Sequence, residues 1–291
     1  MIYRNPKIPE GINYSNANPV KEFALLASGA IAIIILAIYL LGSLLDWSSK
    51  FIPFAYEQEL AEPWVKEFKG SPSTQQNEVA AYLQGLADDM TPLMALEDDV
   101  EITLHYVNSD TVNGMATLGG NIFIFKGLLE KLPSENALAM LLAHEIAHVK
   151  LRHPVKALSK GALFTLLYAV LSGQSNTDVS GLFSGTSQLA FLGFSRSQEQ
   201  AADDEALRVL HQYYRNTQGA SELFNVLLDE SQQSGVEVLS VFHTHPEVTK
   251  RILNAETVSE INNWPTKGQS VKIPTHIQEL VQQDKLQQSS E

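Results

Sequence analysis

The sequence predicts a mainly α chain with a minor β component, preceded by one transmembrane helix. Three observations lead to this fold class. An uncharged apolar run lies near the N-terminus, several later segments carry apolar residues at helical spacing, and a central segment alternates apolar and polar residues. The helical segments outnumber the strand-like ones, so we expect any sheet to be small.

The apolar run extends from Phe23 to Leu45 and contains no charged residue. A helix of this length spans roughly 35 Å, which exceeds the roughly 30 Å hydrocarbon core of a bilayer. The alternatives are a buried core helix and a cleaved signal peptide, but a signal peptide has a shorter apolar region that begins nearer the N-terminus. We therefore expect residues 23–45 to be a retained anchor in contact with membrane lipid, after a short segment over 1–22.

Basic residues on either side of this run predict its orientation. Arg4, Lys7 and Lys21 precede it closely, whereas only Lys50 follows closely. Cytoplasmic flanks of membrane proteins are enriched in Lys and Arg. We therefore expect the N-terminal segment in the cytoplasm and the rest of the chain outside it. The short, anchored, cysteine-free form favours the periplasmic side of a bacterial inner membrane.

Charge and cysteine content exclude several classes of function. The formal net charge of −13 predicts no nucleic-acid partner, because phosphate binding needs a basic surface. The chain has no cysteine, which excludes a disulfide framework, a thiol nucleophile and a thiolate metal site. Any metal must therefore be held by histidine and carboxylate side chains.

Beyond the anchor, the sequence predicts three parts. Residues 46–74 are a linker in which several prolines, among them Pro63, break any long helix. A main domain follows over 75–270 and a polar tail over 271–291, and we expect the polar residues 281–291 to form a frayed or disordered end. Within the main domain we expect helices over 75–90, 134–153, 197–214, 219–234 and 246–263, and extended segments over 100–107 and 113–125.

The segment His144-Glu145-Ile146-Ala147-His148 is the first candidate site. Side chains four residues apart lie on one face of a helix, so His144 and His148 can direct both imidazoles at one metal ion. Glu145 borders the same face and can act as general base toward a zinc-activated water. The alternative is an ordinary helix with two surface histidines. The otherwise apolar helix argues against it, because buried polar groups without partners are costly.

A catalytic zinc usually takes three protein ligands, and His153 is the nearest further candidate. It lies nine residues after His144, so a continuous helix places it on the opposite side, and Pro154 then ends the helix. We therefore expect His153 to point away and to take no part in the chemistry. Glu199, on a later helix, offers a third ligand, and Asp203 can accept the second N–H of a ligating histidine. On an isolated helix these two carboxylates would instead belong to a solvated acidic face.

The sequences HEIAH and, some fifty residues later, SRSQEQAAD together resemble zinc metallopeptidases of the CAAX-prenyl-protease and HtpX type. These are the gluzincins of metallopeptidase family forty-eight. The resemblance implies one Zn²⁺ per chain, held by His144, His148 and Glu199, with Asp203 behind a ligating histidine. The matching segments lie in the order expected for that family.

Two further segments carry the same resemblance. FHTHPEVTKRI, over 242–252, is similar to the family's His-Pro and Arg-Ile element, which implies that His245 and Arg251 face the active site and stabilise the tetrahedral intermediate or bind the substrate backbone. NGMATLGGNIFIF, over 113–125, resembles the strand and turn before the catalytic helix, where an extended substrate is expected to pair. The implied substrate-binding residues are Asn113, Gly114, Met115 and Ala116, with Gly114 standing where family members usually have Ala.

The resemblance implies a zincin-like helical metallopeptidase domain with a small β-sheet at the cleft, in the single-anchor branch. It implies a membrane-anchored zinc endopeptidase acting on peptides or on unfolded or membrane proteins, in membrane and envelope protein quality control. One alternative is a membrane-tethered zinc-containing binding or chaperone-like module without proteolytic activity. Another is a zinc hydrolase with non-peptide substrates. Glu145 argues against the first, because a structural zinc site needs no base; the oligomeric state is left open.

The interval between the two zinc motifs holds a shorter apolar run over 162–171. It is too short to cross a bilayer, which leaves a buried helix or one that lies against the membrane surface. The Ser- and Gly-rich residues 172–187 predict a flexible loop, and we hypothesise that it is a lid. Deleting 174–186 would then raise peptidase activity, whereas unchanged kinetics would refute the lid.

Overall fold

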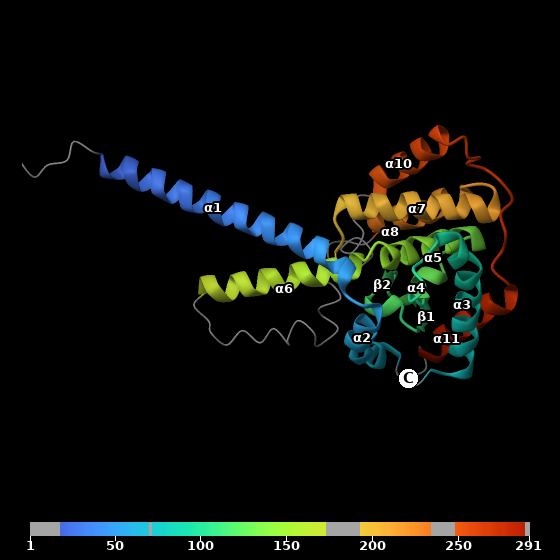
Figure 1. The fold of residues 1–291 in the computed structure, drawn as a ribbon. Coiled ribbons are helices and arrows are strands. Elements are labelled where there is room, and N and C mark those ends of the chain that lie inside the picture. The colour runs from blue at the N-terminus through green and yellow to red at the C-terminus, as the bar shows by residue number, and fades with distance from the viewer. Residues whose placement is uncertain (1–17, 70–71, 173–192, 234–247, 289–291) are drawn as a thin grey trace, which may run out of the picture. The chain divides into compact units, whose positions relative to one another are not determined.

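The computed structural model describes residues 18–69, 72–172, 193–233 and 248–288. Contacts divide the chain into two units, Met1–Leu44 and Leu45–Glu291. Helices dominate each unit, and the described part of the second unit contains one three-stranded sheet. The predicted fold class, mainly α with a small sheet, is therefore confirmed (Figure 1).

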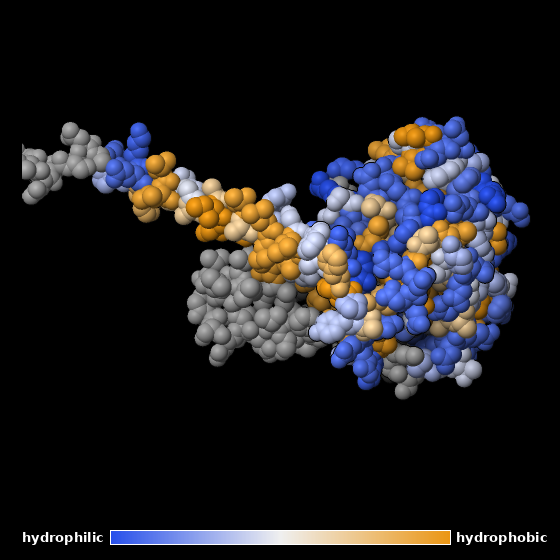
Figure 2. Space-filling view, in the orientation of Figure 1, coloured by the Kyte–Doolittle hydropathy of each residue, from blue (hydrophilic) through white to orange (hydrophobic). Residues whose placement is uncertain are grey.

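The first unit consists mainly of helix α1, Pro19–Ser48, whose last residues belong to the second unit. The side chain of Asn18 caps its start by accepting hydrogen bonds from the backbone N–H groups of Val20 and Lys21. No residue of α1 is buried, and Figure 2 shows apolar side chains along its length. In the described part of the chain it is the single helix long and apolar enough to be a candidate membrane span.

The second unit holds the remaining elements. Its helical elements are η1 (Ser49–Phe51), α2 (Phe54–Lys69), α3 (Thr74–Met94), η2 (Leu118–Gly120), α4 (Lys126–Leu129), α5 (Glu135–Lys150), α6 (His153–Ser172), α7 (Arg196–Tyr214), α8 (Gln218–Gln233), α10 (Val248–Ile261) and α11 (Thr275–Gln288). Its strands are β1 (Thr103–Val107), β2 (Gly114–Ala116) and β3 (Asn121–Phe125). Each helix and extended segment expected in the main domain has a counterpart here, with boundaries shifted by a few residues.

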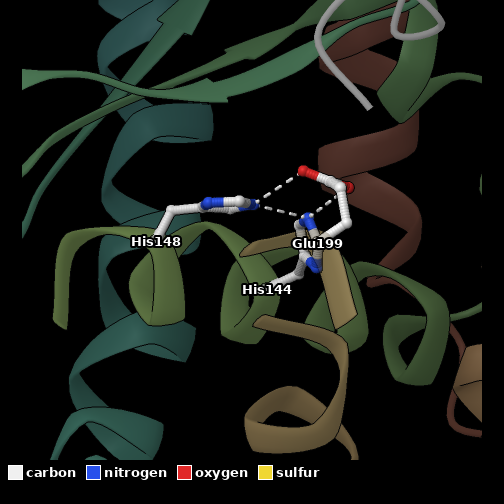
Figure 3. Close-up of side chains that lie close together, drawn as sticks. All are labelled: His144, His148 and Glu199. Carbon is white, nitrogen blue, oxygen red and sulfur yellow. Dashed lines mark hydrogen bonds and ion pairs between the residues drawn. The ribbon is translucent and has the colours of Figure 1, made fainter. Parts of the chain in front are cut away.

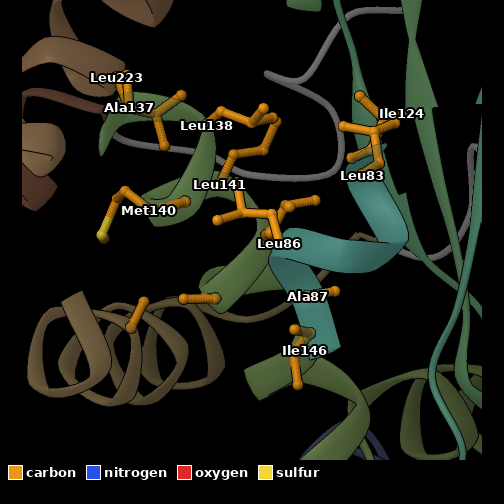
Figure 4. Packing of buried hydrophobic residues seen from close by; sticks show 14 of the residues in the cluster. Leu83, Leu86, Ala87, Ile124, Ala137, Leu138, Met140, Leu141, Ile146 and Leu223 are labelled. Carbon is orange, nitrogen blue, oxygen red and sulfur yellow. The ribbon is translucent and has the colours of Figure 1, made fainter. Parts of the chain in front are cut away.

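Helix α5 is the centre of the core. Every residue from Asn136 to Val149 is buried. The helix contacts α7, α8, α3 and β2, and Figure 4 shows Leu141 and Ile146 among apolar side chains from several of these elements. Such a helix, enclosed on all sides, fixes any side chain that it carries. It therefore provides a rigid base for polar groups that must be held in place.

The sheet has the order β1-β3-β2, with β1 parallel and β2 antiparallel to β3. The predicted turn at Gly119 and Gly120 joins β2 to β3, and both glycines have positive φ, at 65° and 73°. A Cβ on Gly120 would lie 1.9 Å from the carbonyl oxygen of Glu101, so only glycine fits there. Strand β2 contacts α5, which brings the sheet beside the central helix.

The expectation that Pro63 breaks any long helix is wrong, because Pro63 lies inside α2. A proline removes a hydrogen bond to the carbonyl group four residues earlier, here that of Glu59. Both residues are exposed, so water can hydrate that carbonyl and the helix continues. The opposite face of α2 buries Phe54 and Ala61.

The expected frayed end is also wrong for residues 281–288, which continue α11. This helix contacts α3 and buries Ile277 and Val281. Leu280 also packs against the core, so apolar residues on one face dock a segment rich in polar residues. The domain boundaries drawn from the sequence, including the linker over 46–74, stay predictions.

Candidate metal centre

The predicted start of the helix that carries His144, Glu145 and His148, the HExxH segment, is confirmed. Ser134 is the N-cap of α5, and its side chain accepts a hydrogen bond from the backbone N–H of Ala137. The cap fixes where the helix begins and therefore which residues share its faces. His144, Glu145 and His148 are all buried at its C-terminal half.

Glu199 enters from α7, which lies alongside α5. Ser195 and Gln198 form a capping box at the start of α7, so Glu199 lies in its first turn. Its side chain is buried and faces the two histidines (Figure 3). The predicted second helix therefore brings its carboxylate to the HExxH segment across about fifty residues of sequence.

Three side chains converge at this point. The Nε2 atoms of His144 and His148 lie 2.9 Å apart. Glu199 Oε2 lies 3.6 Å from Nε2 of His144, and Glu199 Oε1 lies 3.4 Å from Nε2 of His148. Among the described residues, this is the group of His, Asp and Glu side chains whose donor atoms gather closely enough to hold a metal ion.

This donor set fits zinc. Ligand atoms bound to one zinc at about 2.1 Å in tetrahedral geometry lie about 3.4 Å apart. The two carboxylate-to-imidazole distances match that value, and the two imidazole nitrogens are somewhat closer together than it. Two imidazoles and one carboxylate are also a usual ligand set for catalytic zinc. The residues present therefore fit the metal on geometry and on chemistry.

Asp203 supports the ring of His144 from behind. Its Oδ1 lies 2.9 Å from Nδ1 of His144, and the side chain is buried. Burial alone would raise the pKa of Asp203, but Arg251 and His144 outweigh burial and lower it below its usual value. An ionised Asp203 accepts a hydrogen bond from Nδ1–H of His144, which leaves Nε2 without hydrogen to face the metal position.

Arg251, from α10, completes the charged side of the site. Its Nε and Nη2 donate to Asp203, each at 2.7 Å, and its Nη1 lies 3.0 Å from Glu199 Oε2. Burial alone would lower the pKa of Arg251, but Asp203 and Glu199 outweigh burial and raise it. The predicted active-site arginine therefore lies at the site and pairs with two carboxylates there.

The expectation that His153 points away is wrong. Helix α5 ends at Lys150, Arg152 takes a left-handed conformation with φ of 59°, and His153 begins α6. This turn brings Nδ1 of His153 to 2.8 Å from Nδ1 of His148. Helical periodicity does not apply to His153, because α5 ends at Lys150. Burial, followed by nearby Lys156, lowers the pKa of His153 to about 3, so the ring is neutral.

Two features of the site were not predicted from the sequence, the contact of His153 with His148 and the stacking of Phe194 on His148. Pro154 was a possible signal for the first, because proline is tolerated in the first turn of a helix and can mark the start of a new helix as well as the end of one. Phe194 gave no local signal. It is buried and stacks on His148 with ring centroids 4.0 Å apart and an interplanar angle of 20°.

The predicted substrate-binding strand, β2, lies beside α5, the helix that carries His144 and His148. A Cβ on Gly114 would lie 3.2 Å from Cδ1 of Leu141, one turn before His144 on α5. Glycine therefore allows the close approach of β2 to α5. Of the other predicted residues, His245 and the candidate lid over 172–187, apart from Ser172, lie outside the described residues.

A cavity of about 230 Å³ lies beside the centre, between α7 and α10. Glu199, Asp203 and Arg251 all contribute to its lining. The charged side of the metal site therefore borders open volume, whereas His148 is fully buried.

Comparison with known proteins assigns the family. The family model described as Peptidase family M48 matches residues 74–259, which run from α3 through most of α10 and include every described residue of the site. The chain belongs to peptidase family M48. The resemblance drawn from the sequence is therefore confirmed. Members of this family are zinc-dependent metallopeptidases, in agreement with the converging His-His-Glu group.

Curated relatives of this M48 chain carry peptidase names. It is 27% identical to the "Beta-barrel assembly-enhancing protease" of Escherichia coli (strain K12) over 213 residues, which are 68% of this chain and 43% of the relative. It is 31% identical to the "Mitochondrial metalloendopeptidase OMA1" of Schizosaccharomyces pombe over 161 residues, 54% of this chain and 47% of the relative. The M48 chain thus spans about half the length of these curated relatives.

Proposed function

We propose that the chain is a membrane-anchored zinc endopeptidase that hydrolyses peptide bonds. The observation that carries this proposal is the buried convergence of His144, His148 and Glu199 with Glu145 on the same helix. A structural zinc usually has four protein ligands, whereas three protein ligands with a carboxylate base nearby are typical of a catalytic zinc. The family match to zinc metallopeptidases supports the same reading.

His144, His148 and Glu199 would hold the zinc. When bound, zinc lowers the pKa of water and polarises a carbonyl group. Glu145 takes the proton of the attacking water and passes it to the leaving amine nitrogen as the peptide bond breaks. Asp203 keeps the proton of His144 on Nδ1, which directs Nε2 to the metal. The chain's own contribution is therefore proton transfer by Glu145 and orientation by Asp203.

The charges of the site support a divalent cation. Three buried carboxyl groups, those of Glu145, Glu199 and Asp203, interact electrostatically with the guanidinium of Arg251. Gathered anions repel one another in a low-dielectric interior unless positive charge balances them. Arg251 balances part of that charge, and a Zn²⁺ ion would balance the rest. For this reason we propose that Arg251 positions Glu199 and Asp203, and that oxyanion stabilisation falls to His245.

The substrate proposed is an extended peptide, supplied by unfolded or membrane proteins. Strand β2 lies beside α5 close to His144, where a peptide backbone could pair with Asn113, Gly114, Met115 and Ala116. An enzyme that binds the peptide backbone of its substrate acts on many sequences. This suits quality control of envelope proteins, and the name of the Escherichia coli relative, beta-barrel assembly-enhancing protease, supports such a role.

The membrane placement proposed rests on α1. Its exposed apolar surface fits a lipid environment, and the basic residues Arg4, Lys7 and Lys21, which precede the apolar run over 23–45, favour a cytoplasmic N-terminus. The peptidase domain would then act outside the cytoplasm. A reporter fused after Glu291 tests this: a reporter that is active only in the cytoplasm should stay silent, and a strong signal would reverse the orientation.

The activity is tested by comparing wild type with Glu145→Gln. We expect both to bind one zinc per chain, because Glu145 is not a ligand. We expect wild type to cleave casein and the variant to lose at least about a hundredfold in rate, since general base catalysis contributes factors of that order. Wild type that binds zinc yet cleaves no unfolded protein would favour a binding module instead.

A further inference from the structure

His148 has a partner behind its ring that differs in kind from the partner of His144. The Nδ1 atoms of His148 and His153 lie 2.8 Å apart, and both rings are buried. On the other side of the His148 ring, Nε2 faces His144 and Glu199 (Figure 3). The two nitrogens of one imidazole therefore have separate tasks, one toward the metal position and one toward His153.

The short distance between the two Nδ1 atoms requires one hydrogen between them. Two such nitrogens form a hydrogen bond only if one carries hydrogen and the other offers a lone pair. If Nε2 of His148 is a metal ligand, the hydrogen of its neutral ring must be on Nδ1. His148 is then the donor, and Nδ1 of His153 is the acceptor.

We propose that His153 is a positioning residue that accepts the Nδ1–H hydrogen bond of His148 and so holds Nε2 of His148 toward zinc. The proposal rests on the proposed function, because it takes His148 to be a zinc ligand. Metal-binding histidines generally need an acceptor on the second nitrogen. A neutral imidazole fills that position here, whereas a carboxylate, Asp203, fills it for His144.

The backbone at this turn supports a specific role for His153. Arg152 has a φ of 59°, which is uncommon for a residue with a side chain and carries a conformational cost. Its guanidinium is held by Glu57 Oε1 at 2.6 Å and by the backbone carbonyl groups of Ser49 and Ile52. Three groups from another part of the chain thus maintain the strained turn that delivers His153.

The plane of the His148 ring is fixed as well. Phe194 stacks on it at 4.0 Å, so rotation about the side-chain bonds would lose that contact. Stacking alone sets the plane but does not choose which nitrogen carries hydrogen. The hydrogen bond to His153 makes that choice, so the two contacts perform complementary parts of the positioning.

The test measures zinc affinity by chelator competition in wild type, His153→Phe and His153→Asn. Phenylalanine keeps an aromatic ring but offers no acceptor, and asparagine offers a carbonyl oxygen. We expect His153→Phe to weaken zinc binding about tenfold or more, and His153→Asn to recover most of that loss. His211→Phe is the matched control, because His211 is a partly buried histidine stacked on Trp264 away from the site. It should bind zinc as wild type does.

A second readout separates positioning from packing. In the zinc-loaded wild type, histidine ¹⁵N spectra should show Nδ1 of His148 protonated and Nδ1 of His153 unprotonated. The opposite pattern would overturn the proposal, and so would equal zinc affinities in wild type and His153→Phe. If the phenylalanine variant does not fold, His153→Asn and His153→Ala decide: equal losses of affinity would also overturn it. A wild-type protein that binds no zinc would refute the proposed function instead.

Discussion

The two histidines of the HExxH segment are supported in contrasting ways. His144 is held by Asp203 and, behind it, Arg251, which are charged groups from α7 and α10. His148 is held by His153 and Phe194, which are a neutral ring from the adjoining turn and an aromatic ring. His144 thus depends on ion pairs between α7 and α10, and His148 on an uncharged hydrogen-bond partner and on aromatic stacking.

This difference teaches that a short motif does not by itself make a metal site. The positions of both histidines can be predicted from their spacing on one helix. The groups that set their protonation come from outside that helix. The charged support must be weakened by loss of a single carboxylate or guanidinium. The neutral support must respond to the shape and hydrogen bonding of the ring at position 153.

The largest effect is expected from removing the guanidinium on the charged side. Arg251→Met leaves Glu199 and Asp203 buried without their cation. Breaking such a buried pair typically costs about 3–5 kcal/mol, so the metal-free protein should lose stability of that order. Urea denaturation with and without zinc measures it, and zinc should restore part of the loss because it binds the folded state.

A charge-matched control is Lys267→Met, at an exposed position. It should change the free energy of unfolding by no more than about 0.5 kcal/mol. If Arg251→Met is no more destabilising than this control, Arg251 does not balance the buried carboxylates as proposed.

An intermediate effect is expected from Asp203→Asn. The amide oxygen can still accept from His144, but the negative charge that stabilises the protonated Nδ1 and pairs with Arg251 is lost. Zinc affinity should fall about 10–100-fold, and by more than in His153→Phe, because the charged acceptor contributes more than the neutral one.

The neighbouring Asp204→Asn provides the comparison for this prediction. Asp204 is half-buried and accepts from Asn254. Chelator competition should show it unchanged. Equal losses of zinc affinity in Asp203→Asn and Asp204→Asn would mean that the overall negative charge of α7, and not the hydrogen bond to His144, supports the site.

The smallest effect concerns the ion pair that joins α5 to α7. Glu205 pairs with Lys150 and with Arg208, and although burial alone would raise its pKa, these partners lower it. Glu205→Gln should therefore cost about 0.2–1 kcal/mol at neutral pH. A lowered pKa means that the stabilisation is present above the usual value of 4.5 and is lost as pH falls through the lowered pKa. Denaturation at a series of pH values should show the two proteins converge in acid; a gap that widens in acid would contradict the pairing.

Local patterns predicted much of this structure. The cap at Ser134 and the four-residue spacing placed His144 and His148 correctly on α5. The acidic residues of 197–214 are a plausible solvated face by themselves, and the family resemblance is what favoured Glu199 as a metal ligand and Asp203 as the support of a ligating histidine. The packing of α7 against α5 is what turns Glu199 and Asp203 inward.

The failures arose where tertiary contacts override local rules. His153 was assigned to the wrong side because the left-handed turn at Arg152 is stabilised by Glu57 and carbonyl groups about a hundred residues earlier. A helix break was predicted at Pro63 because proline leaves the carbonyl group of Glu59 without its hydrogen bond. Whether water can reach that carbonyl depends on which face of α2 packs against the rest of the protein. No window of local sequence contains that information.

Anomalous diffraction at the zinc absorption edge, on crystals of zinc-loaded Glu145→Gln protein, tests the metal centre most directly. We predict one strong peak within about 2.0–2.2 Å of Nε2 of His144, Nε2 of His148 and a carboxylate oxygen of Glu199. His153 should lie outside the coordination sphere with its Nδ1 toward His148. A peak bound by His153 in place of Glu199, or zinc located away from α5, would contradict the account.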